Sequence, residues 1–71
     1  MEKLLRIAAQ VFRIPVEKVD LEMDKENLEA WDSLAHLHLI ANIEEEFDIS
    51  IPMEDIPNIH ILADFLQYIK E

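Results

Sequence analysis

The sequence predicts a small all-α fold, a four-helix bundle with three main helices and one short third helix. Apolar residues recur every three or four positions in segments 2–13, 33–47 and 59–70, which is typical of helices that bury one face. Segment 48–52 alternates like a β-strand, but one short strand has no partner here. A chain of 71 residues is expected to form one domain, residues 1–71, around a single core.

The first helix is predicted over residues 2–13. Pro15 ends it, because proline disfavours helical conformation at the residue before it and clashes inside a helix. Residues 15–32 then form a long connection, and a connection of this length is usually functional or packed by its own side chains. The apolar residues expected to hold it on the core are Val16, Val19, Leu21, Met23 and Leu28.

The second helix is predicted to begin at Asp32 or Ser33, both good N-cap residues, and to continue to residue 47. The acidic run 44–46 lies near its C-terminal end, where the helix dipole disfavours negative charge. This placement hints at a use of these acids other than folding. The apolar period of the helix is formed by Leu34, Leu37, Ile40, Ala41, Ile43 and Phe47.

The C-terminal third is predicted to contain a connection and two helical segments. Residues 48–52 are extended and bury Ile49 or Ile51. Residues 53–57 form one helical turn that Pro57 closes. Asn58 then caps a last helix over residues 59–70. Its inward stripe is formed by Ile59, Leu62, Ala63, Leu66 and Ile69, with Phe65 beside them.

The charge distribution excludes several kinds of partner. Six basic and sixteen acidic residues give a net charge of −10, and residues 26–69 hold ten acids but no Lys or Arg. Such a polyanion is not expected to bind nucleic acid or an anionic membrane surface. It favours a protein partner with a basic surface, and self-repulsion favours a monomer.

Absent residue types narrow the chemistry further. Without Cys the chain has no thiolate nucleophile and no Cys-based zinc site, and without Gly it has no phosphate-binding loop. No apolar run reaches membrane-spanning length and no signal-peptide pattern is present, so a small cytoplasmic domain is the default expectation.

The histidines and the acidic connection do not predict a metal site. His36 and His38 are two positions apart and point to different faces of a helix, whereas a helical zinc pair is four apart. We expect these two and His60 to be solvated or at the rim of the fold. The acids between residues 20 and 26 imitate a calcium loop, but Trp31 stands where its last ligand should be.

Ser33 leaves two interpretations open. Its hydroxyl either caps the second helix or carries a phosphate ester, which helix N-terminal amides favour. Ser33 and His36 are also one helical turn apart, like a nucleophile and its base. No oxyanion hole or cleft is indicated, so we expect no catalytic residue.

The motifs of the chain resemble those of the acyl carrier protein family. Asp32-Ser33-Leu34 is followed by Ile-Glu-Glu-Glu-Phe-Asp-Ile-Ser-Ile-Pro at 43–52 and by Ala-Asp-Phe-Leu-Gln-Tyr-Ile at 63–69. The resemblance covers nearly the whole chain and is strongest over residues 28–69. A bare Asp-Ser-Leu is a weak motif, but the three motifs in this order and spacing form a strong one.

This resemblance implies an acyl-carrier-like bundle with a covalent 4′-phosphopantetheine, derived from coenzyme A, on Ser33. Asp32 and Leu34 flank the attachment site. The domain would be no enzyme but would carry an acyl or aminoacyl group as a thioester. The implied partners are a phosphopantetheinyl transferase, an acyl ligase or acyltransferase, and a downstream synthase or transferase with a basic docking patch.

The resemblance also implies a docking surface along the second and third helices. Each exposed ion pair would contribute only about 0–1 kcal/mol, so transient and salt-sensitive docking is expected. By carry-over, the partner-binding residues are Trp31, His36, Leu37, Glu44, Glu45, Asp48, Glu54 and Asp55.

Departures from the family pattern favour a specialised role. Ala35 and His38 stand where fatty-acid carriers usually have acidic residues. Trp31-Asp-Ser-Leu is similar to stand-alone carriers of surface-polysaccharide or secondary-metabolite pathways, and Trp31 either caps the core or anchors a partner. Phe65 is expected to fill part of the acyl pocket, so the cargo would be short or polar. The rival hypothesis is an unmodified acidic helical interaction domain.

Overall fold

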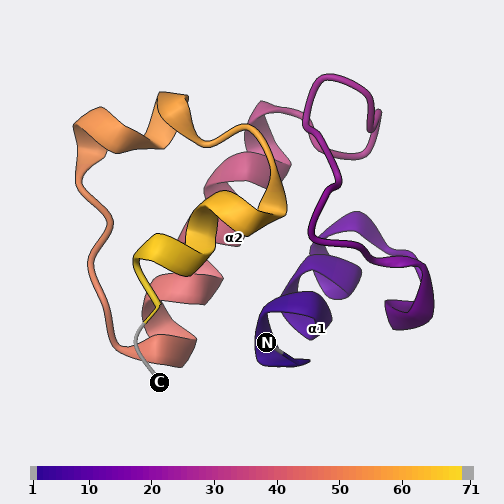
Figure 1. The fold of residues 1–71 in the computed structure, drawn as a ribbon, viewed down its shortest axis with the longest axis horizontal. Helices are drawn as coiled ribbons and strands as arrows, with labels where there is room; N and C mark the ends of the chain where they lie inside the picture. Colours follow the sequence, from indigo (N-terminus) through magenta and orange to yellow (C-terminus); the bar gives the residue numbers. More distant parts are fainter. Residues whose placement is uncertain (1, 70–71) are drawn as a thin grey trace.

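The computed structural model describes residues 2–69. Its helical elements are α1 (Glu2–Phe12), η1 (Val16–Lys18), α2 (Ser33–Phe47), η2 (Met53–Asn58) and η3 (Leu62–Gln67), where η marks a 3₁₀-helix (Figure 1). Within residues 2–69 no β-strand forms, and an isolated bridge pairs Asp24 with Ile61. The all-α prediction is therefore confirmed.

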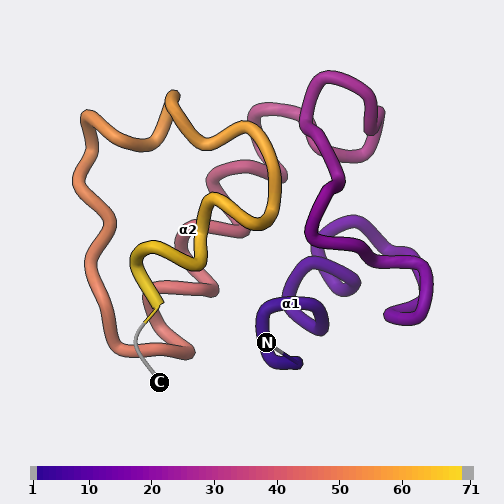
Figure 2. Tube along the Cα trace, in the orientation of Figure 1, coloured from indigo at the N-terminus to yellow at the C-terminus, as the bar shows by residue number. Residues whose placement is uncertain are grey.

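One hydrophobic core joins α1, α2, η3 and the connections between them. The extended segment 48–52 returns the chain from the end of α2 to its first turn, where η2 lies (Figure 2). Of the connection residues expected on the core, Val19 is buried and Val16 is exposed. The largest fully buried side chains are Leu4, Leu39, Ile43, Ile59, Leu62 and Phe65.

Both α-helices end in a left-handed residue, although the chain contains no glycine. After α1, Arg13 has φ 60°, and the Ile14 N–H donates to the Ala9 carbonyl at 3.1 Å. After α2, Asp48 has φ 54°, and the Ile49 N–H donates to Glu44 in the same way. These bonds satisfy carbonyls at the helix ends. The left-handed backbone nevertheless costs free energy at a residue that has a Cβ.

The apolar period predicted for α2 matches its buried face only in part. Ile40 and Ile43 are buried as expected, but Leu34, Leu37 and Ala41 are exposed. Apolar residues surround most of this helix, so their period alone does not identify the buried face. The residues of α2 that the structure buries are Ala35, His36, Leu39, Ile40 and Ile43.

Glu44 has a structural use, contrary to the interpretation of the acidic run at the end of α2. Its Oε2 accepts a hydrogen bond from the Ile51 N–H at 2.7 Å. This contact fixes segment 48–52 on α2 and buries Ile51, while Ile49 is half-buried. The interaction with a main-chain donor offsets the unfavourable position of a carboxylate at this end of the helix.

The last helix is shorter than the predicted 59–70. The N–H groups of Leu62 and Ala63 donate to the carbonyls of Met23 and Leu21, and Ile61 forms the bridge to Asp24. Residues 60 and 61 are therefore held extended against the long connection, and the helix begins only at Leu62. Residue 70 lies outside the described residues.

Asn58 does not cap this last helix: Ile61 is at its N-cap position, and Asp64 in the first turn supplies the side chain that accepts from the N–H groups before the helix. The Asp64 carboxylate accepts hydrogen bonds from the N–H groups of His60 and Ile61, at 2.9 and 3.2 Å. Asn58 instead closes η2, where its side-chain amide donates to the Glu54 carbonyl. Pro57 lies inside η2, one residue before its end.

Replacing Arg13 with glycine is expected to stabilise the fold by about 0.5–1 kcal/mol, because glycine adopts φ 60° without a Cβ clash. Part of the gain is offset by the greater freedom of glycine in the unfolded chain. Urea unfolding at neutral pH measures the difference. Arg13→Ala is the control, because it removes the charge but keeps the Cβ; an equal gain in both variants would contradict the backbone explanation.

Candidate functional site

Ser33 is the first residue of α2 and is exposed. Asp32 is the N-cap: its backbone is extended, and its Oδ1 accepts from the Ala35 N–H at 2.8 Å. The capping interpretation of Ser33 is therefore wrong, because Asp32 performs this role. The Ser33 hydroxyl stands at the end of a helix where another protein can reach it.

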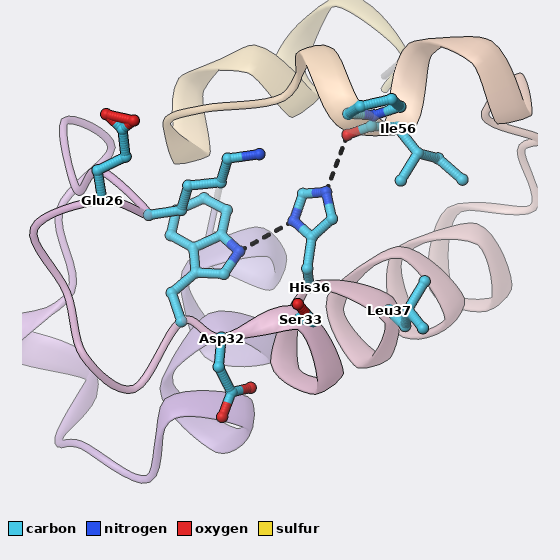
Figure 3. Close-up of a pocket in the computed structure, with 9 residues that line it drawn as sticks. Glu26, Asp32, Ser33, His36, Leu37 and Ile56 are labelled. Atoms are coloured by element: carbon cyan, nitrogen blue, oxygen red, sulfur yellow. Dashed lines mark hydrogen bonds between the residues drawn. The ribbon is translucent and has the colours of Figure 1, made fainter.

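An open groove of about 590 Å³ lies beside Ser33. Figure 3 shows that α2 forms one side of it, Ile56 of η2 another, and the connection that carries Glu26 a third. The groove thus lies between three segments, of which η2 is distant in sequence from the other two. Its lining residues are Lys25, Glu26, Trp31, Asp32, Ser33, His36, Leu37, Ile56 and Pro57.

Two hydrogen bonds through His36 hold the walls of this groove together (Figure 3). The Trp31 indole N–H donates to His36 Nδ1 at 3.0 Å, and His36 Nε2 lies 2.9 Å from the Ile56 carbonyl. An indole can only donate, so Nδ1 accepts and the proton is on Nε2, which donates to Ile56. His36 is therefore a neutral imidazole in this arrangement.

Trp31 and His36 are interior residues. Trp31 is 3% exposed and packs on Phe12 of α1 at a ring-centroid distance of 5.4 Å. The interpretation of Trp31 as a core cap is confirmed. The expectation that His36 is solvated or at the rim of the fold is wrong, because it is 9% exposed and buried, whereas His38 and His60 are exposed as expected.

The same bonds remove His36 as a base for Ser33. One ring nitrogen accepts from Trp31 and the other donates to Ile56, so neither is available to take the Ser33 proton. A serine hydrolase at this position is therefore inconsistent with the geometry. Within residues 2–69, no three His, Asp or Glu side chains gather as metal ligands either.

A family model, the phosphopantetheine attachment site, matches residues 2–69. The chain belongs to this family. Its carrier domains hold 4′-phosphopantetheine covalently and are not enzymes, so the chain is a phosphopantetheine-bearing carrier protein. Domains of this family interact with phosphopantetheinyl transferases and with enzymes that handle acyl groups.

The residues around Ser33 fit a phosphopantetheine arm. The hydroxyl is exposed and is not the helix cap, and the groove beside it has the volume of a small-molecule site. Its walls offer apolar surface from Leu37, Ile56 and Pro57. When bound, the group supplies a thiol, which this Cys-free chain lacks.

The docking residues implied by the resemblance divide into three groups. Trp31 and His36 are buried, so their side chains shape the site from inside. Glu44 and Asp55 are half-buried and hold main-chain or side-chain donors of the fold. Those that the structure places on the surface of the carrier domain are Leu37, Glu45, Asp48 and Glu54.

The resemblance implied Leu37 as a partner-binding residue, but the helical period did not show that Leu34, Ala41 and Met53 are exposed as well. Leu34 and Leu37 are 63% and 56% exposed and share one face of α2 with Ala41 and Glu45, at spacings of three and four. Met53 of η2 is 83% exposed. A second apolar stripe opposite the core stripe was visible in the sequence, but nothing local marked it as the outer one.

Tyr68 links η2 to the C-terminal end of the described chain. Its hydroxyl donates to Asp55 Oδ2 at 2.8 Å. This hydrogen bond, with smaller effects of burial and of the Asp55 and Asp64 charges, raises the pKa of Tyr68 above 10.0.

Among residues 2–69, no helix is both long and apolar enough to cross a membrane.

His36→Ala is expected to lower the free energy of unfolding by about 2–4 kcal/mol, because Trp31 loses its acceptor and Ile56 its donor inside the fold. Urea unfolding measures this loss. The matched control is His38→Ala, two positions along α2 and exposed, with an expected change below about 0.5 kcal/mol. Similar losses in both variants would refute a structural role specific to His36.

Tyr68→Phe is expected to weaken the alkaline dependence of stability. Because the pKa is raised in the fold, the contribution of Tyr68 is complete below about pH 10 and is lost as the pH rises through the folded-state pKa. Unfolding of both proteins between about pH 8 and 11 tests this, since the advantage of wild type should shrink with pH. Tyr68 is the sole tyrosine, so tyrosinate absorbance reports its pKa, which Asp55→Asn should lower.

Proposed function

We propose that Ser33 carries the 4′-phosphopantetheine and that residues 1–71 act as a single domain presenting an acyl or aminoacyl thioester to partner enzymes. The observation that supports this is the position of the Ser33 hydroxyl: exposed, on the first residue of α2, beside the groove, with capping left to Asp32. In the transfer, Ser33 Oγ would attack the coenzyme A phosphorus that bears the pantetheine, so that a phosphodiester forms as the pyrophosphate P–O bond breaks. Adenosine 3′,5′-bisphosphate would leave, and the hydroxyl proton would pass to a base of the transferase.

The surface near Ser33 supports a specialised pathway, in surface polysaccharide or secondary metabolism, over housekeeping fatty-acid synthesis. Fatty-acid carriers usually have acids at the positions of Ala35 and His38. Here Ala35 is buried and His38 is exposed without a negative charge. The exposed neighbours of Ser33 on this helix are Leu34 and Leu37. Along α2, a partner therefore meets apolar side chains between Ser33 and the acids at the far end of the helix.

Partner enzymes dock, in this proposal, on the outer face of α2 and on η2. The surface combines an apolar part near Ser33 with acids toward the end of the helix, and a basic patch on the partner pairs with those acids. The partners are a phosphopantetheinyl transferase, an acyl ligase or acyltransferase, and a downstream synthase or transferase. The docking surface consists of Leu34, Leu37, Ala41, Glu45, Asp48, Met53 and Glu54, all exposed.

The proposed cargo is short or polar, and the domain acts as a cytoplasmic monomer. Phe65 is fully buried and is among the largest buried side chains of the core. In this proposal the Phe65 ring fills part of the pocket that a long acyl chain would need. The net charge of −10 supports the monomer through self-repulsion.

Incubation with coenzyme A and a broad-range phosphopantetheinyl transferase is expected to add one phosphopantetheine to the wild-type protein and none to Ser33→Ala. Intact mass spectrometry measures the gain. Ser50→Ala is the matched control, because Ser50 is the other serine of the chain and is also exposed. It should be modified like wild type.

A wild-type protein that gains no mass would contradict the proposal and leave the unmodified interaction domain as the better hypothesis. That rival predicts that Ser33→Ala keeps full activity and that only the acidic surface matters. Glu45→Lys tests the acidic surface without disturbing the fold, since Glu45 is exposed. Glu44→Lys would also remove the acceptor of the Ile51 N–H.

A further inference from the structure

We propose that Lys25 forms an ion pair with the phosphodiester on Ser33 and so holds the first part of the phosphopantetheine arm in the groove between α2 and η2. This inference rests on the proposed attachment of the arm to Ser33. It assigns a role to a residue of the long connection that no sequence motif singled out.

The N-terminal end of α2 already holds an anion. The Asp32 carboxylate accepts from the Ala35 N–H at 2.8 Å, and the Asp32 carbonyl accepts from the His36 N–H at 2.9 Å. A phosphodiester on Ser33 would add a negative charge beside Asp32 and Glu26, in a protein of net charge −10. The Asp32 carboxylate already uses the favourable interaction with the helix dipole. A nearby cation would therefore be needed to hold the phosphate in one position.

Lys25 is the cation that the fold provides there. It is the basic residue among those lining the groove, and no Lys or Arg follows it before residue 70. The neutral His36 adds no charge, because it accepts from the Trp31 indole. The ion pairs formed within residues 2–69 join Lys3 to Glu46 and Arg6 to Glu2, so Lys25 is not engaged in them.

The main chain around Lys25 is held in place. Its N–H donates to the His60 carbonyl at 2.9 Å, and the adjoining Asp24 pairs with Ile61. The Glu26 N–H donates to Asp24 Oδ1 at 2.8 Å. The Lys25 side chain is half-buried. A fixed backbone limits the positions of the ammonium group, and this lowers the entropy cost of an ion pair.

The ion pair gives the arm a resting position along Ile56 and Pro57, from which a partner can release it. A basic partner surface that meets the phosphate competes with Lys25 for the same charge. High salt should have the same effect, because an accessible pair is screened. Docking and release of the arm are then linked to the partner's own positive charge.

The experiment uses the protein carrying phosphopantetheine whose two amides are labelled with ¹⁵N. Relaxation measurements on these amides report whether the arm is ordered with the protein or moves independently. Wild type is compared with Lys25→Met, which removes the charge, and Lys25→Arg, which keeps it. Lys18→Met is the matched control, because Lys18 is exposed on η1 and does not line the groove.

In wild type at low salt, the amide nearer the phosphate should be ordered. Lys25→Met should lower the docked fraction by about two- to fivefold, the range expected for an accessible ion pair. About 0.5 M NaCl should do the same in wild type through screening. Lys25→Arg and Lys18→Met should leave the arm as in wild type.

Equal dynamics of the arm amides in wild type and Lys25→Met would overturn the inference. A loss of order in Lys18→Met as large as that in Lys25→Met would also overturn it, because it would indicate a general charge effect. The protein amide spectrum identifies misfolding of Lys25→Met, and salt on wild type then provides the independent test. If Ser33 gains no phosphopantetheine at all, the proposed function fails and the inference with it. If Ser33 is modified but the arm of the wild-type protein moves independently, the role proposed for Lys25 is refuted and the attachment to Ser33 is not.

Discussion

The hydrogen bonds from the Trp31 indole to His36, and from His36 to the Ile56 carbonyl, join the end of the long connection and the first turn of α2 to η2, which lies 20 positions after His36. Packing of Trp31 on Phe12 adds the end of α1 to this connection. A buried imidazole, indole and carbonyl would each cost free energy if unsatisfied, but here each is the partner of another. Among residues 2–69, no buried side-chain nitrogen or oxygen lacks a partner. The groove beside Ser33 exists in this shape because these bonds hold its walls.

The same constraint separates a carrier from a catalyst. A histidine one turn from a serine has the spacing of a catalytic pair, but both of its ring nitrogens are engaged within the fold. Ser33 is left exposed and without a base of its own, which suits a residue that another enzyme modifies. Chemistry then comes from the attached group and from partners, in agreement with the family to which the chain belongs.

The acidic excess has two physical uses. Some carboxylates hold backbone or side-chain donors: Asp32 caps α2, Glu44 fixes the segment after it, Asp55 accepts from Tyr68, and Asp64 accepts from the two N–H groups that precede η3. Others, such as Glu45 and Glu54, are exposed and give the surface a negative electrostatic potential. From the sequence these two groups look alike, since a carboxylate that caps a turn and one that faces solvent occupy similar polar positions. Their partners, often several residues away, distinguish them.

Local sequence patterns were enough to predict the extent of α1 and α2, the short helix near residue 53 and the motif around Ser33. Helical period, capping and proline effects act within a few residues, so a local window contains them. The tertiary structure alone decided that Leu34 and Leu37 face outward, that His36 is buried, and that the last helix begins at Leu62. These outcomes depend on contacts such as that between His36 and Ile56, 20 positions apart, which no local pattern encodes. Apolar residues surround α2, and only the packing of the other segments selects which of them are buried.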